Sequence, residues 1–286
     1  MEHVVTVHED NSRADKVVTN ICRDAGYAFI QSLFRRHRIK VNGLKISASH
    51  RLHAGDVVKI FADLSETRRD QPEFVQRLWK QLQRMIIFEH EDFFAINKPP
   101  GLAVQSGTKV GMCVDALIKS YPEHRCHLVH RLDKDTSGLL LVAKNQTAAR
   151  RFTGLFRENK IHKTYLAVVD GLITTSGRIE NFLEKSFIDD EEKMRVSESG
   201  LLAVTEYRPL KSSNGHTLLE LKPSTGRKHQ LRVHCADVLD TPILGDVKYH
   251  SNSQHRRLFL HAQKIFIEEL ETEIEAPPPA HFGDWI

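Results

Sequence analysis

The sequence predicts an α+β fold in two unequal parts, and three patterns along its 286 residues lead to that prediction. Residues 1–65 alternate short helix and strand patterns with tight turns. Residues 66–84 are polar, contain Pro72 and hold one short helix pattern, which is typical of a linker. From Met85 onward, long alternating strand patterns with a few helices predict one larger domain over residues 85–286.

Two helices are predicted in the N-terminal part. The first spans residues 13–25, with Ser12 as its N-cap and Gly26 just past its end. The second spans residues 28–38 and carries apolar side chains at core spacing. Both helices need a partner surface for their apolar faces, so we expect them to pack on the strands that follow.

The strands of this part are marked by their turns. Asn42-Gly43 is a two-residue hairpin turn, which predicts that the strand over residues 39–41 pairs with one starting at Leu44. A second turn at residues 53–56 precedes the apolar strand over residues 57–61. Residues 1–65 therefore form a compact αβ module.

Overall composition is that of a globular protein, with 40% hydrophobic and 27% charged residues. No run of eighteen apolar residues is present, and the N-terminal segment lacks the basic and apolar regions of a secretory signal. We therefore expect a cytoplasmic protein. Its four cysteines have no paired spacing, and we expect them to be reduced and structural: Cys22, Cys113, Cys126 and Cys235.

The positive charge is concentrated near the N-terminus. Residues 11–65 hold ten Lys and Arg against four Asp and Glu, whereas the whole chain has a net charge of only +4. This distribution favours a nucleic-acid-binding module, and the alternative is a solvated cationic face. The candidate RNA-binding residues are Arg35, Arg36, Arg38, Lys40, Lys45 and Arg51.

A reactive carboxylate is predicted at Asp133. It lies in the polar segment 130–138, which leads into the apolar run Leu139 to Ala143, read as a buried strand. Asn145 then caps a helix. A loop held by a core strand can fix a functional side chain, although an ordinary Asx turn would have the same residues.

A second informative segment, residues 223–234, contains Arg227. Thr225 is read as a helix N-cap, which places Arg227 on one face with Leu231, Cys235 and Val238. A guanidinium on an apolar helix face is costly to bury unless a carboxylate meets it. The acidic residue that faces Arg227 is then either part of a structural salt bridge or a catalytic aspartate.

These segments carry a family resemblance. HRLDKDTSG followed by LLLVAK, TGRKHQLRVH and PILGD (residues 242–246) resemble the RluA family of pseudouridine synthases. Three further segments agree in order, at residues 95–102, 163–167 and 258–262. The resemblance covers roughly residues 85–286, and it implies a long mixed, mainly antiparallel sheet with flanking helices and a central cleft.

Residues 1–65 resemble the αL-type RNA-binding domain found in ribosomal protein S-four and many tRNA synthetases. This module before such a domain is the layout of the large-subunit (23S) ribosomal RNA synthases of types C and D, and the three-part organisation favours type C. The resemblance implies large-subunit ribosomal RNA as the partner. It also implies no metal and no cofactor, because the isomerisation has no net redox change, and we expect a monomer.

The resemblance also implies roles for single residues. Asp133 would attack the target uridine at the anomeric carbon or at carbon-6, Arg227 would hold that carboxylate ionised, and Tyr165 would stack on the base and help proton abstraction. The candidate substrate-binding residues are Arg131, Lys98, Leu132 and His130. Without the resemblance, Tyr165 reads as a half-buried strand tyrosine and Lys98 as part of a plain turn. A stacked uridine must be flipped out to be reached.

Two rival interpretations remain. In one, a zinc site is formed by His124, Cys126, His127 and His130, but this spacing is too irregular for one strand or helix to aim all four at an ion. In the other, the chain is a non-catalytic RNA-binding ribosome-assembly factor. The presence of Asp133, Tyr165 and Arg227 together argues against it.

Overall fold

The computed structural model describes the chain except residues 23–26, 63–71, 106–111, 122–124, 189–190 and 251–254. It divides into two compact units, Met1–Leu78 and Trp79–Ile286. The division falls within helix α3 (Pro72–Gln83), among the residues predicted to link the two parts. Among the described helices, none combines the length and the apolar character needed to cross a membrane.

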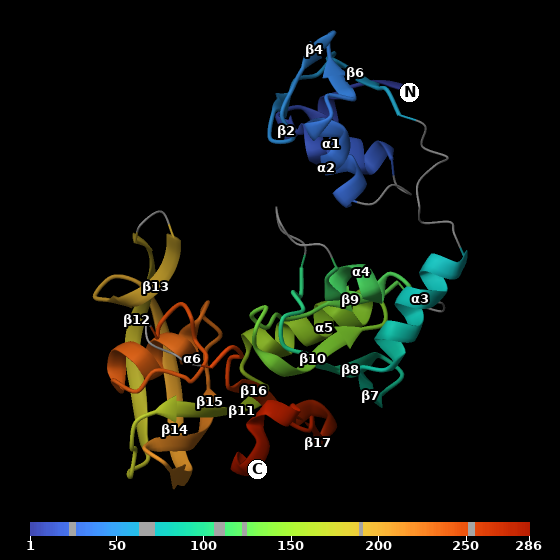
Figure 1. The fold of residues 1–286 in the computed structure, drawn as a ribbon. Coiled ribbons are helices and arrows are strands. Elements are labelled where there is room, and N and C mark those ends of the chain that lie inside the picture. The colour runs from blue at the N-terminus through green and yellow to red at the C-terminus, as the bar shows by residue number, and fades with distance from the viewer. Residues whose placement is uncertain (23–26, 63–71, 106–111, 122–124, 189–190, 251–254) are drawn as a thin grey trace. The chain divides into compact units, whose positions relative to one another are not determined.

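The first unit packs two helices against a small sheet (Figure 1). Its main sheet has the order β1-β6-β3-β4, and β2 pairs with β5. The core is formed by apolar side chains from both helices and from β3 and β6. The elements are β1 (Glu2–Val4), η1 (Val7–Glu9), β2 (Ser12–Arg13), α1 (Ala14–Ile21), α2 (Tyr27–Arg35), β3 (Ile39–Val41), β4 (Leu44–Lys45), β5 (Arg51–Leu52) and β6 (Val57–Ile60).

The helices of this unit are shorter than predicted, while the turns are as predicted. Ser12 pairs with Leu52 in a strand instead of capping α1, which begins at Ala14; the predicted end of that helix lies outside the described residues. α2 ends at Arg35, and His37 then adopts a left-handed φ of 55° that a helix cannot contain. Asn42 and Gly43 have φ of 50° and 82°, the backbone of a type I′ hairpin turn.

The second unit is built on an eleven-stranded sheet with the order β13-β12-β14-β15-β11-β16-β10-β8-β7, to which β17 and β9 add at β16 and β10. Only β10 and β16 pair in parallel among the described strands, so the predicted mixed, mainly antiparallel sheet is confirmed. The strands are β7 (Ile86–Glu89), β8 (Phe93–Lys98), β9 (His127–Leu128), β10 (Ser137–Ala143), β11 (Ile161–Asp170), β12 (Gly177–Ile188), β13 (Glu191–Ser197), β14 (Leu201–Ser213), β15 (His216–Pro223), β16 (Leu260–Ile267) and β17 (Thr272–Glu275).

Strand β10 is buried along its whole length because both faces of this part of the sheet are covered. Phe93 packs on Phe152 of helix α5 (Gln146–Arg157), with ring centroids 4.9 Å apart. Its neighbour Phe94 points to the other face and stacks on Tyr121, which follows helix α4 (Val114–Ile118). A strand covered on both faces reads as a continuous apolar run, which is why the sequence predicted it correctly.

Asn145 caps α5 as predicted, since its side chain accepts a hydrogen bond of 2.8 Å from the Ala148 amide.

A second helix, α6 (Gln230–Val233), packs on the part of the sheet formed by β11 and β15, and it continues as the wider π-type turn η3 (His234–Val238). Leu231 and Cys235 pack against β11 and β15, but Val238 is 41% exposed. The widened turn shifts Val238 away from the face that a regular helix would give it. Short turns η4 (Glu268–Leu270) and η5 (Ala280–Trp285) follow.

The parallel contact between β10 and β16 requires a glycine. Gly138 has a φ of +108°, and a Cβ there would lie 2.2 Å from the carbonyl oxygen of Ala262. Any side chain would push the two strands apart. Because the loop before β10 carries Asp133, this close approach fixes where that loop leaves the sheet.

Candidate active site

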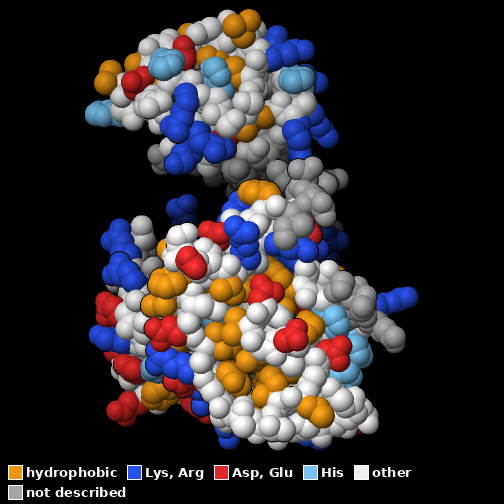
Figure 2. All heavy atoms as spheres, turned by 90° about the vertical axis from the view of Figure 1, so that its left-hand side faces the viewer, with side chains coloured by type: hydrophobic (Ala, Val, Ile, Leu, Met, Phe, Trp, Pro, Cys, Tyr) orange, Lys and Arg blue, Asp and Glu red, His pale blue; other side chains and the backbone are white. Residues whose placement is uncertain are grey.

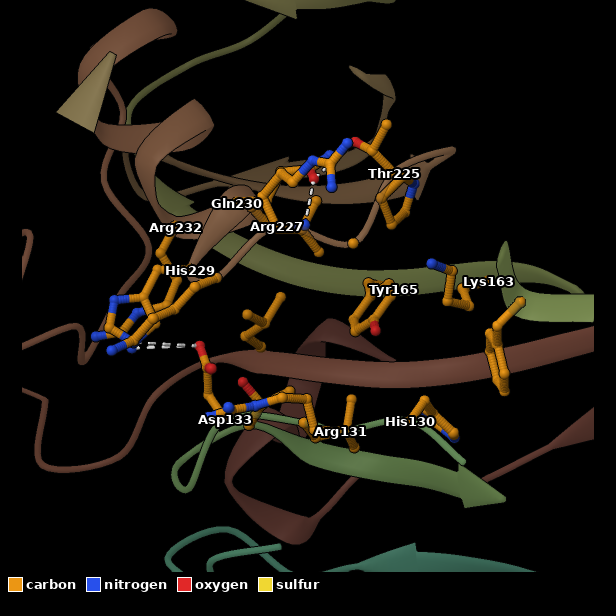
Figure 3. Close-up of a pocket in the computed structure, with 18 of the residues that line it drawn as sticks. His130, Arg131, Asp133, Lys163, Tyr165, Thr225, Arg227, His229, Gln230 and Arg232 are labelled. Atoms are coloured by element: carbon orange, nitrogen blue, oxygen red, sulfur yellow. Dashed lines mark hydrogen bonds and ion pairs between the residues drawn. The ribbon is translucent and has the colours of Figure 1, made fainter. Parts of the chain in front are cut away.

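A pocket of about 340 Å³ opens where the loop before β10, strand β11 and the segment before α6 meet (Figure 3). Asp133 lies at one end of it with His229 and Arg232, and Lys163 and His130 lie toward the other end. The volume is in the range of sites that take one small molecule or one nucleotide. Its lining includes His130, Arg131, Leu132, Asp133, Lys163, Tyr165, Arg227, His229, Gln230 and Arg232.

The loop that carries Asp133 is anchored by hydrogen bonds from the buried ammonium of Lys98. The Lys98 ammonium donates to the backbone oxygens of Lys134 at 3.0 Å, Pro99 at 3.0 Å and Leu102 at 2.9 Å, and its side chain is fully buried. Burial lowers the pKa of Lys98 to about 8, although the charges of Asp135 and Asp133 act in the opposite direction. The structure thus places Lys98, a predicted substrate-binding residue, beneath the loop of Asp133 and not among the residues that line the pocket. Lys98 is the last residue of strand β8, and its side chain faces the interior.

Asp133 meets Arg232, which the sequence had not singled out. The nearest guanidinium nitrogen of Arg232, Nη1, lies 3.5 Å from Asp133 Oδ2, across a sequence separation of 99 residues. Arg232 also makes a two-pronged contact with Asp246: Nε and Nη2 each donate to one carboxylate oxygen at 2.7 Å. Burial alone would lower the pKa of Arg232, but the hydrogen bonds and charge of Asp246, together with Asp133, raise it. The guanidinium thus stays charged beside Asp133.

Asp246 is itself fixed by backbone amides. Its side chain is fully buried, and Oδ1 accepts hydrogen bonds from the amides of Lys248 and Tyr249 at 3.0 and 3.1 Å. Gly245, with a φ of +76°, shapes the turn, because a Cβ there would lie 1.7 Å from the carbonyl oxygen of Arg257. The PILGD segment therefore supplies the acid that holds Arg232, and the matched string was the one signal for it in the sequence.

The predicted pairing of Arg227 with Asp133 is wrong. The helix begins at Gln230, not at Thr225. Thr225 accepts from the Val204 amide and donates to Gln230 Oε1, at 2.9 and 2.8 Å, so its hydroxyl extends the pairing of β15 along β14 instead of capping a helix. Arg227 lies farther along the same segment, and its Nε donates to the Leu202 carbonyl at 2.8 Å.

Tyr165 and Lys163 enter the pocket from the same face of β11. Burial, and then the charge of Asp133, raise the pKa of Tyr165 above its ordinary value, so its hydroxyl keeps its proton near neutral pH. Burial lowers the pKa of Lys163. No carboxylate within the described residues forms an ion pair with the Lys163 ammonium, which makes it a donor available to a ligand. The sequence contained Lys163 only as part of a matched segment.

The other predicted pocket residues have different exposures. Arg131 is exposed at the pocket wall, and Leu132 is 5% exposed. The imidazole of His130 accepts a hydrogen bond from the Leu141 amide at Nε2, at 2.8 Å, and stacks near Phe156. Burial, with the charge of Lys163, lowers the pKa of His130 to about 3. His130 is therefore a neutral part of the wall that also supports β10.

The six candidate RNA-binding cations all lie on the first unit, where Figure 2 shows lysine and arginine side chains on the visible face. Lys40 is half-buried and the other five are exposed. None of them forms an ion pair with a carboxylate in the part of the chain that the structure describes. Lys40 and Lys45 are opposite each other on β3 and β4. These charges are therefore free to meet phosphates.

The zinc interpretation finds no support among the residues that the structure describes. Of these, only His90, Glu91 and Asp92 group closely enough to hold an ion, and Asp92 is already paired with Arg151 at 2.7 Å. Cys126 is a buried free thiol, and His124 lies outside the described residues. The four free cysteines are all buried, which agrees with the prediction of reduced, structural thiols.

Comparisons with known proteins point in one direction. A family model described as RNA pseudouridylate synthase matches residues 92–237. The chain is 38% identical over 292 residues to the ribosomal large subunit pseudouridine synthase C of Rickettsia conorii, covering 95% of each chain. It is 35% identical to the protein of the same name from Vibrio vulnificus, covering 94% of this chain and 90% of that one. Human RNA pseudouridylate synthase domain containing 4 has a similar structure, with a TM-score of 0.62 and 30% identity over 73% of this chain and 94% of that one.

Proposed function

This chain belongs to the RNA pseudouridylate synthase family, and on that premise we propose that it isomerises uridines of large-subunit ribosomal RNA with Asp133 as the reactive carboxylate. The relatives named above as large-subunit synthases match nearly the full length of the chain, which supports ribosomal RNA as the substrate. The single observation that carries the assignment of Asp133 is its position beside Arg232 at one end of the pocket.

The reaction breaks the bond between the ribose anomeric carbon and nitrogen-1 of uracil, and joins that carbon to carbon-5. Asp133 attacks either the anomeric carbon or carbon-6 of the base, and the carboxylate is released when the new bond is complete. Carbon-5 loses a proton and nitrogen-1 gains one, so nothing is oxidised or reduced. An ionised carboxylate is needed at the start, and the charged guanidinium of Arg232 favours that state.

Tyr165 is proposed to stack on the flipped base and to take part in the removal of the carbon-5 proton. Its ring lines the pocket from β11, and tyrosine combines a flat apolar ring with a polar end. Since its pKa is raised in this pocket, the phenol is protonated when substrate enters. The phenol can accept the carbon-5 proton only if it gives up its own hydroxyl proton at the same time. We therefore assign Tyr165 the role of a proton relay and not that of a general base that is already deprotonated.

The cations around the site are proposed to hold the RNA. A uridine must leave its stack to reach Asp133, which costs a few kcal/mol. Lys163 within the pocket and Arg131 at its wall can donate to phosphate or carbonyl oxygens of the flipped nucleotide. The exposed cations of the first unit, such as Arg35, Arg36 and Arg38, can offset the remaining cost by contacts to phosphates farther along the RNA.

The test of the catalytic assignment is Asp133→Asn. We expect it to abolish conversion of uridine to pseudouridine in large-subunit ribosomal RNA, measured in RNA from cells lacking the protein, while RNA binding persists. Asparagine is nearly isosteric with aspartate but cannot act as an anionic nucleophile. Turnover by this variant at a rate near that of the parent would remove the assignment.

The test of the RNA-binding surface is the triple variant Arg35→Gln, Arg36→Gln, Arg38→Gln. Each arginine that neutralises a phosphate contributes roughly 0.7 to 0.9 to the slope of log affinity against log salt. We therefore expect weaker RNA binding with a flatter salt dependence, measured by titration at several salt concentrations. The matched control is Arg178→Gln with Arg195→Gln and Arg208→Gln, which removes three exposed arginines that already pair with Glu180, Glu184 and Glu220 on the other unit. A parent-like slope in the triple variant would contradict the proposal.

A further inference from the structure

His229 adopts a left-handed backbone conformation, which is uncommon for a residue that has a Cβ. Its φ of 53° and ψ of 18° place it in the left-handed region immediately before α6. A residue with a Cβ pays on the order of 1 kcal/mol there, and glycine is the usual choice. Backbone strain of this kind at a pocket wall supports the hypothesis that the side chain has a functional role. The imidazole is only 11% exposed and lines the pocket beside Asp133.

The hydrogen-bond partners of His229 fix which ring nitrogen carries its proton. Nδ1 lies 2.8 Å from the hydroxyl oxygen of Tyr249, and that oxygen already accepts a hydrogen bond from the Met194 amide at 2.9 Å. An amide nitrogen can only donate, and Nδ1 is the one acceptor among the described residues that the Tyr249 hydroxyl contacts, so we place the hydroxyl hydrogen toward Nδ1. The proton of the neutral ring is then on Nε2, which lies 3.8 Å from Asp133 Oδ2.

The ring is neutral in this environment. Burial lowers the pKa of His229 to about 4, against the opposite effect of Asp133, and the charges of Arg232, Lys228 and Lys248 lower it further. A neutral imidazole with its proton on Nε2 is a pure donor toward a carboxylate. It adds no second full charge next to Arg232.

Arg232 alone holds Asp133 loosely. Two of its nitrogens are bound to Asp246, and only Nη1 remains for Asp133. Both contacts of Asp133, from Arg232 and from His229, end at Oδ2. Oδ1 has no hydrogen-bond partner among the described residues.

We propose that His229 is a positioning residue for Asp133: its Nε2–H, set by Tyr249, pins Oδ2 together with Arg232 and leaves Oδ1 as the attacking atom. The inference rests on the proposed role of Asp133. The 3.8 Å separation closes to a hydrogen bond when substrate fills the pocket and excludes water. Tyr249 serves the same end twice, because its ring also lies under the Arg232 guanidinium, with 5.1 Å between Cζ and the ring centroid.

The experiment compares three replacements of His229 that differ in where they place a donor. The amide nitrogen of His229→Gln is as many bonds from the backbone as Nε2, whereas that of His229→Asn matches Nδ1. His229→Gly removes the side chain and the backbone strain together. Turnover number, KM and thermal midpoint are measured for each, with large-subunit ribosomal RNA from cells lacking the protein as substrate.

We expect His229→Gln to keep the turnover number within about fivefold of the parent. His229→Asn and His229→Gly should lower it by roughly tenfold to a hundredfold, the effect of one donor to a charged group, with KM within about twofold. Neither should melt at a lower temperature, since asparagine and glycine tolerate the left-handed region. Parent-like turnover in the asparagine or glycine variant, equal losses in Gln and Asn, or losses that follow a lowered thermal midpoint would each overturn the proposal.

A second measurement reads the proton directly. In protein labelled with ¹⁵N in histidine, the His229 ring should show an unprotonated Nδ1 and a protonated Nε2 at neutral pH, and Tyr249→Phe should mix the two tautomers. A parent protein with the His229 proton on Nδ1 would contradict the proposed positioning role. If Asp133→Asn remains active, the proposed function fails; if it is inactive while the His229 variants behave alike, only the inference fails.

Discussion

The segment 224–229, which carries Arg227, and helix α6, which carries Arg232, are adjacent in sequence, and both arginines line the same pocket, yet their surroundings differ. Arg227 donates to one backbone carbonyl and is half-buried. Arg232 is 8% exposed and lies between two carboxylates. A buried guanidinium needs full compensation, whereas a half-buried one can use water. Because both residues are arginines, it is the depth of burial and the partners of each side chain that decide which one can control the charge of Asp133.

Lys98 extends the comparison to a third cation. It is as deeply buried as Arg232, but its partners are three backbone carbonyls, and no carboxylate among the described residues lies within hydrogen-bond distance. Its pKa falls, whereas that of Arg232 rises. Dipoles alone thus stabilise a buried cation less than a paired carboxylate does.

Arg232→Met gives the largest expected effect. Turnover should fall at least about a hundredfold, because Asp133 loses its cation, and stability should fall by roughly 3–5 kcal/mol, because Asp246 is left buried and unpaired. Denaturant unfolding and single-turnover kinetics measure the two losses. Adding Asp246→Leu should restore much of the stability but none of the turnover. If the double variant regains activity, Arg232 acts through structure alone.

Lys98→Met should remove a pH dependence of stability. Between pH 8 and 10.5, the folded lysine has released a proton that the unfolded chain still binds, since its pKa falls from 10.5 to about 8 on folding. The free energy of unfolding therefore rises with pH in this window, by up to roughly 3 kcal/mol from this group. The difference between parent and variant, measured by denaturant unfolding across the window, isolates it from the other lysines. If the difference in free energy of unfolding between parent and variant stays constant from pH 8 to 10.5, the lowered pKa of Lys98 is refuted.

Arg227→Ala gives the smallest expected effect. Its removal leaves one carbonyl at a solvated edge, so stability should change by less than about 1 kcal/mol. Turnover should change by less than about tenfold, with any decrease seen mainly in KM for RNA, because this arginine does not touch Asp133. An effect on turnover as large as that of Arg232→Met would break the comparison between the two arginines.

The sequence was sufficient where structure is local. The run Leu139 to Ala143, the cap at Asn145 and the turn at Asn42 each depend on neighbouring residues, and each was predicted correctly. The start of α6 was not, because Thr225 is engaged by Val204 and by the buried amide of Gln230, whose own nitrogen bonds back to β14. Such tertiary hydrogen bonds override the preference of threonine for a helix N-cap.

The site residues divide in the same way. Asp133 could be found because it stands in a polar loop between apolar segments. The sequence predicted that an arginine would pair with Asp133 but not which one. Any cation on the 223–234 segment could have supplied the positive charge that keeps this carboxylate ionised. Asp246 and His229 gave no signal beyond membership of matched strings, because their roles arise only from contacts across the fold.

The place of β16 in the sheet has a consequence for how the protein is made. This strand, residues 260–267, lies between β11 and β10, which are synthesised well before it. Until it emerges from the ribosome, the two halves of the sheet have no shared edge, and the loop of Asp133 cannot be brought to Arg232. Such long-range pairing slows folding. The nascent chain therefore cannot isomerise uridine for most of its translation, and the catalytic site is completed in one late step.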